Sequence, residues 1–451
     1  MPVILDADTI PRLDGKMLRP IFDHRVCLLI CGEGGSGKTS LACQIARWAM
    51  SDSPDERLSN HLMLPILIEE ELDFEVVEGK GHLMEAIRGK LEDLLGAAEP
   101  LSEELLEHLL RYRRVLVIVD QFSELTEHTQ KRIQPQLGGF AVHALAVTSR
   151  TEKILEGSSK TIIRTLRIEG NRLSSFVERY LQALGKRDLF DDPEYFDACR
   201  RLSMMVGERR ITVLLAKLYA EQMVAGKEDA GEERLPENIP DLMLSYVNEL
   251  NRRAQKDEPD DRTIHQAARI VAWECVRRGY RPTRSKREDV LKALAKSELS
   301  NTVLGYLEAR LRLIQTVEPG RDQIRFAIDP LAEYLAGLYL VENLAEDQEQ
   351  WNVFLDGAKC VPGAPESIKE FLLAVRDCCA ARQDDIHVPE FVTQQIGKLV
   401  GLDPEVVKRA QLEQRIRRLI GGLDVPEDED RINAIKALGN IGPGADRSAP
   451  I

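Results

Sequence analysis

The sequence lacks long apolar runs: no stretch of its 451 residues approaches the ~18 apolar residues of a membrane-spanning helix, and no signal peptide opens the chain. Its eight cysteines include no CxxC pair, and no cluster of His and Cys has zinc-site spacing. The net charge of −14 argues against a general affinity for nucleic acids or anionic membranes. These absences predict a cytoplasmic protein with reduced cysteines. The adjacent Cys378 and Cys379 allow a redox pair, although small buried helix residues are the commoner role.

The composition is that of a globular protein, with 43% apolar and 30% charged residues. The length exceeds one ordinary hydrophobic core and suits two to four domains. Fold class and function must therefore come from motifs and from the order of the predicted elements.

A glycine-rich segment, GEGGSGKTS at 32–40, follows the apolar run VCLLIC at 26–31 and precedes a helical pattern of apolar residues. In a strand–turn–helix of this kind, backbone N–H groups and the helix N-terminus bind phosphates. The lysine neutralises the β- and γ-phosphates, and the threonine hydroxyl binds Mg²⁺. A glycine turn without a ligand is the alternative. The pattern predicts a nucleotide site formed by Gly32, Gly34, Gly35, Ser36, Gly37, Lys38, Thr39 and Ser40, with Thr39 also on the metal.

A second strand, VLVIV at 115–119, is apolar throughout and ends at Asp120. A P-loop site needs an acid at the end of a neighbouring strand to hold the metal, directly or through water, and Asp120 has that position. Glu124 follows four residues later and is the candidate base that polarises the attacking water. An N-capping aspartate after a buried strand is the alternative for Asp120.

A third strand, ALAVTS at 144–149, ends at Arg150. At a strand end beside the P-loop, Arg150 would sense the γ-phosphate. By itself the signal is weak, because an arginine that closes a strand is usually solvated.

These three stretches, GEGGSGKT, DQFSE and TSR in that order, resemble the NACHT branch of the STAND signal-transduction ATPases, and the similarity covers most of residues 25–345. The resemblance implies that Asp120 coordinates magnesium, that Glu124 is catalytic, and that Arg150 is the first sensor. It also implies adenine nucleotides, ATP and ADP, as the ligands.

The sequence departs from the family pattern at several positions. Gln121 replaces a small residue and Ser123 replaces an aspartate, which leaves Glu124 as the remaining base and predicts slow hydrolysis. Val213 or a neighbour stands where the family has a proline near the adenine. The segment FAIDPLAEYLAG at 326–337 lacks the family's histidine, whose place falls near Ile328 or Asp329.

The remaining patterns are helical. After the core, apolar residues at i, i+3, i+4 and i+7 predict a helical bundle, and residues 263–344 predict a winged helix. Within it, Ser285 and Glu288 form a predicted capping box, and an EPGRD turn joins two strands. The tail resembles one HEAT-like repeat, which cannot bury its apolar face alone and suggests a truncated array. The predicted fold is an α/β P-loop core with a parallel sheet, followed by α-helical segments. Its expected parts are an N-terminal segment 1–24, a P-loop NTPase core 25–165, a helical domain 166–255, a winged helix 256–345, a helical linker 346–420 and a HEAT-like repeat 421–451.

Three functions fit these motifs. The first is an ATP/ADP-gated switch with slow hydrolysis, which oligomerises when a trigger binds its C-terminal repeats; by resemblance its setting is bacterial defence or signalling. Its effector is not visible in the sequence. The second is a nucleotide-regulated DNA-binding regulator, since residues 277–312 hold ten Lys or Arg against four Asp or Glu. The third is a plain turnover ATPase or nucleotide kinase, although no arginine-rich lid is apparent.

Overall fold

A computed structural model of the chain describes residues 3–402, except residues 7, 11–12, 70, 73–81, 97–99, 169, 207–210, 229–234, 253, 256–257 and 318–321. The predicted HEAT-like repeat at 421–451, the end of the predicted linker and most of the predicted EPGRD turn lie outside the described residues. The chain divides into two compact units, Met1–Ala336 and Gly337–Ile451.

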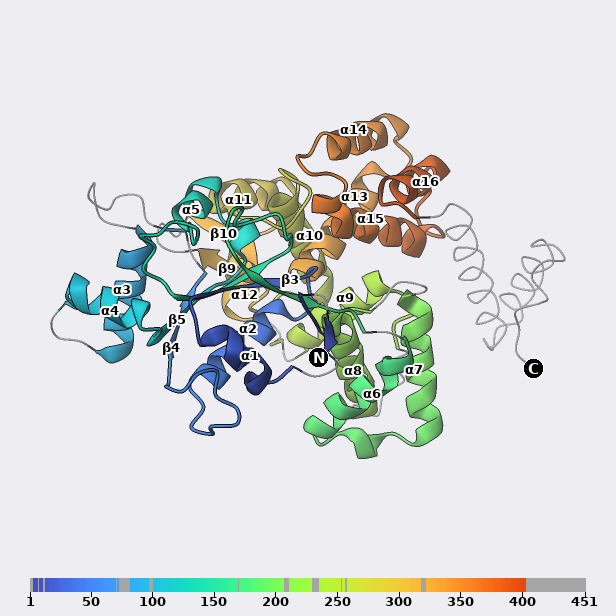
Figure 1. Cartoon of the computed structure of the whole chain (residues 1–451). Helices are drawn as coiled ribbons and strands as arrows, with labels where there is room; N and C mark the ends of the chain where they lie inside the picture. The colour runs from blue at the N-terminus through green and yellow to red at the C-terminus, as the bar shows by residue number, and fades with distance from the viewer. Residues whose placement is uncertain are drawn as a thin grey trace. The chain divides into compact units, whose positions relative to one another are not determined.

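The first unit begins with a seven-stranded sheet (Figure 1). Its spatial order is β2-β1-β7-β3-β6-β5-β4, in which the five strands from β7 to β4 are parallel and β1 pairs antiparallel with β2 and β7. The expected P-loop core with a mainly parallel sheet is confirmed. The strands are β1 (Val3–Leu5), β2 (Asp8–Ile10), β3 (Val26–Cys31), β4 (Leu64–Ile68), β5 (Val115–Val119), β6 (Ala144–Ser149) and β7 (Thr161–Thr165).

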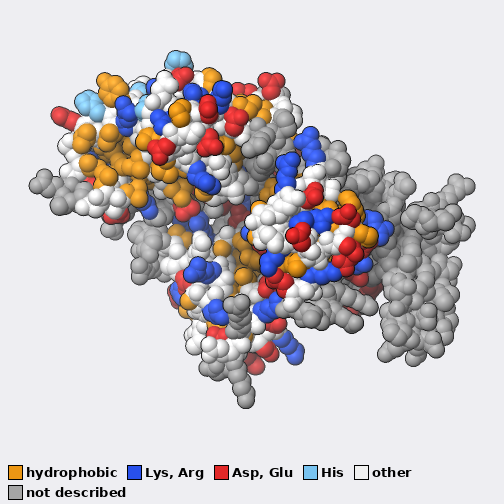
Figure 2. Space-filling model, turned by 90° about the horizontal axis from the view of Figure 1, so that it is seen from below, with side chains coloured by type: hydrophobic (Ala, Val, Ile, Leu, Met, Phe, Trp, Pro, Cys, Tyr) orange, Lys and Arg blue, Asp and Glu red, His pale blue; other side chains and the backbone are white. Residues whose placement is uncertain are grey.

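The central strands are apolar throughout because helices cover both faces of the sheet. On β3, Val26, Leu28 and Ile30 join the core under α1 and α2, whereas the alternate residues Cys27, Leu29 and Cys31 join the core under α3 and α4. The helices of this part are α1 (Gly15–Phe22), α2 (Lys38–Ala49), α3 (His82–Leu95), α4 (Glu103–Arg111) and α5 (Glu127–Arg132). An area of apolar side chains is seen on the side where α3 and α4 lie (Figure 2).

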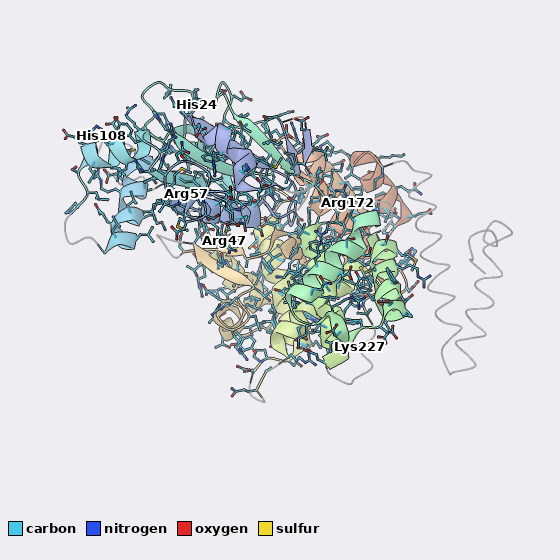
Figure 3. The ribbon with its side chains drawn as sticks, turned by 60° about the horizontal axis from the view of Figure 1, so that its bottom comes forward. His24, Arg47, Arg57, His108, Arg172 and Lys227 are labelled. Carbon is cyan, nitrogen blue, oxygen red and sulfur yellow. The ribbon has the colours of Figure 1, made fainter. Side chains whose placement is uncertain are left out.

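Four helices follow the sheet, as the periodicity predicted: α6 (Gly170–Ala183), α7 (Asp192–Val206), α8 (Val213–Glu228) and α9 (Ile239–Asn251). Helix α6 packs against α7 and α8, and α8 packs against α9. Lys227, near the end of α8, forms an ion pair of 2.5 Å with Glu194 of α7, and Figure 3 marks this lysine together with Arg172 of α6.

The next segment contains α10 (Asp261–Val276), β8 (Ser285–Lys286), α11 (Arg287–Lys296), α12 (Asn301–Ala309), β9 (Ile314–Val317), β10 (Gln323–Phe326) and α13 (Asp329–Leu344). Its three strands form a sheet of order β8-β10-β9. The assignment of this α10–α13 segment as a winged helix stays a prediction.

The predicted capping box at Ser285 is wrong. Ser285 lies in β8, opposite Ile324 of β10, and Lys286 precedes α11 at the N-cap without a side-chain capping bond. Pairing with β10 holds the backbone of Ser285 in the ladder, so its buried hydroxyl is not positioned at the helix end.

The second unit is helical in its described part. It contains the end of α13, α14 (Gln348–Lys359), α15 (Lys369–Arg382) and α16 (Glu390–Leu399), and α16 packs against both α14 and α15. Cys378 and Cys379 are buried in α15. None of the helices in the part of the chain that the structure describes combines the length and apolarity needed to cross a bilayer.

Candidate functional site

The P-loop is held in shape by hydrogen bonds among its own residues and with the end of β7. Ser36 is 1% exposed, and its hydroxyl donates to the Glu33 carbonyl at 2.8 Å and accepts from the Thr165 hydroxyl at 2.7 Å. Gly35 and Gly37 have φ of 71° and 90°, in the left-handed region that favours glycine. Gly37 ends the loop as the N-cap of α2, so that the first N–H groups of α2 face the loop opening.

Lys38 is directed into this loop. Its Nζ donates to the Glu33 carbonyl oxygen at 2.7 Å, which places the ammonium over the loop. Burial, and then the nearby Arg150 guanidinium, lower the pKa of Lys38. The carboxylates whose charges act on Lys38 belong to residues outside the loop. A phosphate group bound in the loop would bring negative charge next to the Lys38 ammonium.

Thr39 and Asp120, the two predicted metal ligands, lie side by side, and their role on a metal stays a prediction. The Thr39 hydroxyl lies 2.9 Å from Oδ2 of Asp120, which is 1% exposed at the end of β5. Thr148, at the end of β6, donates to Oδ1 of the same carboxylate. A hydroxyl beside an oriented carboxylate, next to a phosphate-binding loop, is an oxygen donor set suited to Mg²⁺, directly or through water.

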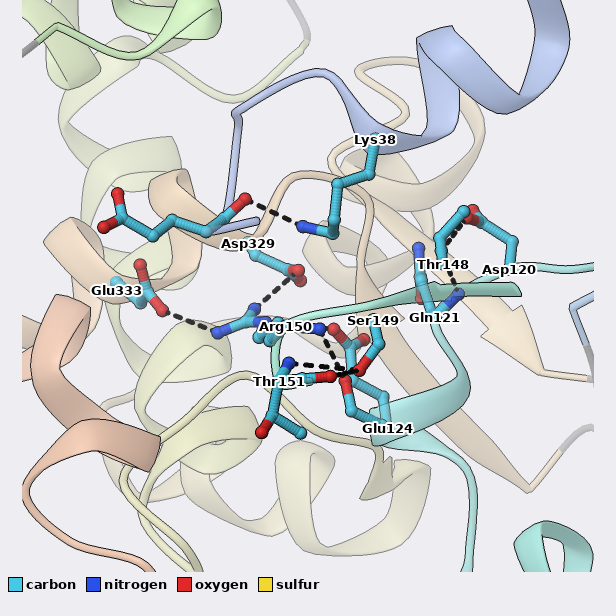
Figure 4. A network of polar contacts seen from close by, with 12 residues as sticks. Lys38, Asp120, Gln121, Glu124, Thr148, Ser149, Arg150, Thr151, Asp329 and Glu333 are labelled. Carbon is cyan, nitrogen blue, oxygen red and sulfur yellow. Dashed lines mark hydrogen bonds and ion pairs between the residues drawn. The ribbon is translucent and has the colours of Figure 1, made fainter. Parts of the chain in front are cut away.

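Arg150 lies among three carboxylates (Figure 4). Its Nε is 3.1 Å from Oε1 of Glu124, its Nη2 is 2.6 Å from Oδ2 of Asp329, and its Nη1 is 3.2 Å from Oε1 of Glu333. Only 17% of the Arg150 side chain is exposed, and 4% of that of Glu333. The arginine that the sequence placed at the strand end is therefore engaged in ion pairs rather than solvated.

Glu124 follows β5 in a short 3₁₀ turn, Phe122–Glu124. Burial, followed by repulsion from the Asp329 carboxylate, raises the pKa of Glu124 to about 7, against the opposing charge of Arg150. A carboxyl with a pKa in this range is suited to accept a proton near neutral pH. In this arrangement one oxygen of the Glu124 carboxyl group, Oε1, is engaged by the Arg150 guanidinium.

The later segments contact the P-loop directly. The N–H of Leu214, in the first turn of α8, donates to the Gly35 carbonyl at 3.1 Å, so Val213 opens α8 beside the loop. Pro330, in the first turn of α13, lies over Gly34 and Gly35: a Cβ built on either glycine would come within 3.5 Å and 3.2 Å of its Cγ. Asp329, near the place of the missing histidine, contacts Arg150.

Several basic residues of the α10–α13 segment have acidic partners in the same unit. Arg284 pairs with Glu71 at 3.3 Å, and Arg287 pairs with Glu308 at 3.0 Å. Both arginines belong to the basic stretch 277–312 on which the DNA-binding hypothesis rests, and both form ion pairs within the chain.

Sequence reasoning missed three contributors to the site. Thr148 and Thr165 are buried polar residues at the ends of β6 and β7. A threonine at the end of a strand that neighbours the P-loop strand could have indicated both of them. Glu333 carried no such signal, because its partner Arg150 is 183 residues earlier in the chain.

Comparison with known proteins gives a family match in the second unit. Residues 361–404, which include α15 and α16, match the family described as NACHT C-terminal helical domain 4. Among curated proteins, the sequence finds no significant match.

Two solved structures are similar at low identity. One is a STAND protein with a tetratricopeptide-repeat sensor from Pyrococcus horikoshii, with 13% identity, a TM-score of 0.34, and coverage of 95% of this chain and 60% of that chain. The other is Drosophila ORC bound to DNA, with 11% identity, a TM-score of 0.26, and coverage of 67% and 86%. This chain thus spans less than two thirds of the archaeal protein, and both TM-scores lie below 0.5, too low to bear on function.

The nucleotide motifs and the family match are independent observations on different parts of the chain. The P-loop, the Thr39–Asp120 pair and the buried Arg150 lie together at the ends of β3, β5 and β6. The chain thus combines a P-loop core with a C-terminal segment, residues 361–404, that is similar to NACHT C-terminal helical domain 4.

Proposed function

We propose that the chain is an ATP/ADP-binding molecular switch in signal transduction or bacterial defence, in which slow ATP hydrolysis gates a conformational change and self-assembly. The observation that carries the proposal is the double ion pair of Arg150 with Asp329 and Glu333. It joins the strand end that would sense the γ-phosphate to the segment that would move. A residue with both contacts couples the nucleotide state to the position of α13.

In this proposal different residues of the site bind different parts of the nucleotide. The N–H groups at the start of α2 and the Lys38 ammonium hold the phosphates. Thr39 and Asp120 would hold Mg²⁺, which when bound would neutralise phosphate charge. Glu124 accepts the proton of the attacking water once it is released from Arg150. The engagement of Glu124 with Arg150, together with Ser123 in place of a second acid, supports slow turnover.

The proposed switch also implies which partners the chain would bind. When activated, the chain would associate with further copies of itself, and its C-terminal repeats would take an unidentified trigger ligand in the cytoplasm. DNA binding by the α10–α13 segment remains the alternative, and no contact of the described residues favours it.

The test is to identify the nucleotide that co-purifies with the protein, by denaturation and chromatography, and to measure the mass in solution with ADP and with ATP. We expect ADP on a monomer, a larger species with ATP, and turnover below about one per second. An empty site with fast ATP turnover and an unchanged mass would overturn the switch.

A further inference from the structure

Asp329 and Glu333 are one helical turn apart in the first part of α13, so both carboxylates lie on the same face of that helix. Both contact a single group, the Arg150 guanidinium, through separate nitrogens. Two acids that converge on one buried arginine reproduce what a phosphate offers it, namely two or more oxygens with negative charge.

The same carboxylates lie at the phosphate loop. Pro330, between them in sequence, covers Gly34 and Gly35. The Asp329 charge acts on Lys38 as well as on Arg150, so it lies near both cations that a terminal phosphate would use. Added phosphate charge at this place meets a carboxylate that is already there.

The charges of this cluster show which ligand it tolerates. Two cations, Lys38 and Arg150, lie near three carboxyl groups, Glu124, Asp329 and Glu333, all partly or fully buried. The charge of the predicted metal ligand Asp120 also acts on Lys38. A diphosphate can use the loop N–H groups and Lys38 and leave Arg150 with its acids. A triphosphate brings further charge to Arg150, which cannot be neutralised by that cation while Asp329 and Glu333 hold it.

We propose that Asp329 and Glu333 stand in for the terminal phosphate on Arg150, and thereby make this site select nucleoside diphosphate over triphosphate. The inference deepens the proposed function and rests on it: the triphosphate binds only when the first turn of α13 leaves Arg150. The acids are specificity-determining residues, and the exchange of carboxylate for phosphate on Arg150 is the event that releases α13.

The experiment compares Asp329→Asn, Glu333→Gln and the wild-type chain after bound nucleotide has been removed from each. Titration calorimetry measures the affinities for Mg-ADP and Mg-ATP at a temperature low enough to prevent ATP hydrolysis. We expect Asp329→Asn to raise the ATP affinity at least tenfold while the ADP affinity changes less than threefold, and Glu333→Gln to act in the same direction. Glu103→Gln, which removes an exposed carboxylate from α4, is the matched control and should leave both affinities unchanged.

Asp329→Glu, which keeps the charge, should retain the wild-type preference for ADP. Parallel changes in both affinities, or an unchanged ratio in Asp329→Asn, would overturn the inference and leave the nucleotide switch standing. If Asp329→Asn does not fold, an unchanged ratio in Glu333→Gln has the same meaning. A wild-type chain that binds neither nucleotide would instead refute the proposed function itself.

Discussion

Arg325 of β10 donates a hydrogen bond from Nη1 to Oε1 of Gln121 at 2.7 Å, between residues 204 positions apart in the chain. Gln121 follows Asp120 and has a φ of 55°, in the left-handed region that a residue with a Cβ rarely adopts. The residue that departs from the family pattern thus accepts a strained backbone and gains a contact with the α10–α13 segment. This contact gives a first prediction.

Gln121→Ala should remove the hydrogen bond and keep the strain, and so lower the free energy of unfolding by about 1–3 kcal/mol. Gln121→Gly should lose the same bond but relieve the strain, and be about 1 kcal/mol more stable than the alanine variant. Denaturant unfolding of the two variants and the wild type measures both terms. Equal stability of the alanine and glycine variants would show that the left-handed conformation costs nothing.

Lys38→Ala should abolish nucleotide binding, because it removes the ammonium that lies over the P-loop. Saturating nucleotide at 100 times its dissociation constant should stabilise the wild-type chain by about 2.7 kcal/mol and the variant not at all. Thermal unfolding with and without Mg-ADP measures this difference. Lys16→Ala, on the exposed face of α1, should keep the full stabilisation.

Glu124→Gln should bind nucleotide normally and lose residual hydrolysis, because the amide cannot accept the proton of the attacking water. Phosphate release over hours, with nucleotide binding measured on the same preparation, checks both parts. Hydrolysis at the wild-type rate in this variant would assign the base to another residue.

The raised pKa of Glu124 gives hydrolysis a pH dependence. Its carboxyl must be ionised to act as a base, so kcat/KM for ATP, which reports the ionisation of the free enzyme, should rise with pH and reach half its plateau near pH 7. Asp329→Asn removes a charge that raises this pKa, and should move the midpoint to lower pH. A rate that is flat from pH 5 to pH 8 would contradict the assignment.

The raised pKa of Glu124 also determines the direction in which the stability of the folded chain changes with pH. A carboxyl group whose pKa is higher in the folded than in the unfolded chain stabilises the folded chain at pH values below its ordinary pKa. This contribution is lost as the pH rises through about 7, the pKa of Glu124 in the folded chain. Relative to Glu124→Gln, the wild-type chain should therefore lose stability between pH 5 and pH 8. Unfolding at both pH values checks this.

Local sequence patterns were sufficient for the nucleotide-binding elements. The runs at Val26–Cys31 and Val115–Val119 are apolar at every position because both faces of these strands are covered, and their ends therefore locate the P-loop and Asp120. The helices after the core carry their own periodicity. A local pattern failed at Ser285, where pairing with β10 competes with a helix cap and the ladder holds the backbone.

By itself the sequence determined the position of the P-loop, of Thr39 and Asp120, and of Arg150, because each belongs to a short motif tied to the end of a strand. Only the tertiary structure decided that β6 lies between β3 and β5, which brings Thr148 to Asp120. It also decided that Asp329 and Glu333 close on Arg150. These contacts join residues far apart in the chain, and their geometry depends on how whole strands and helices pack, which no local periodicity records.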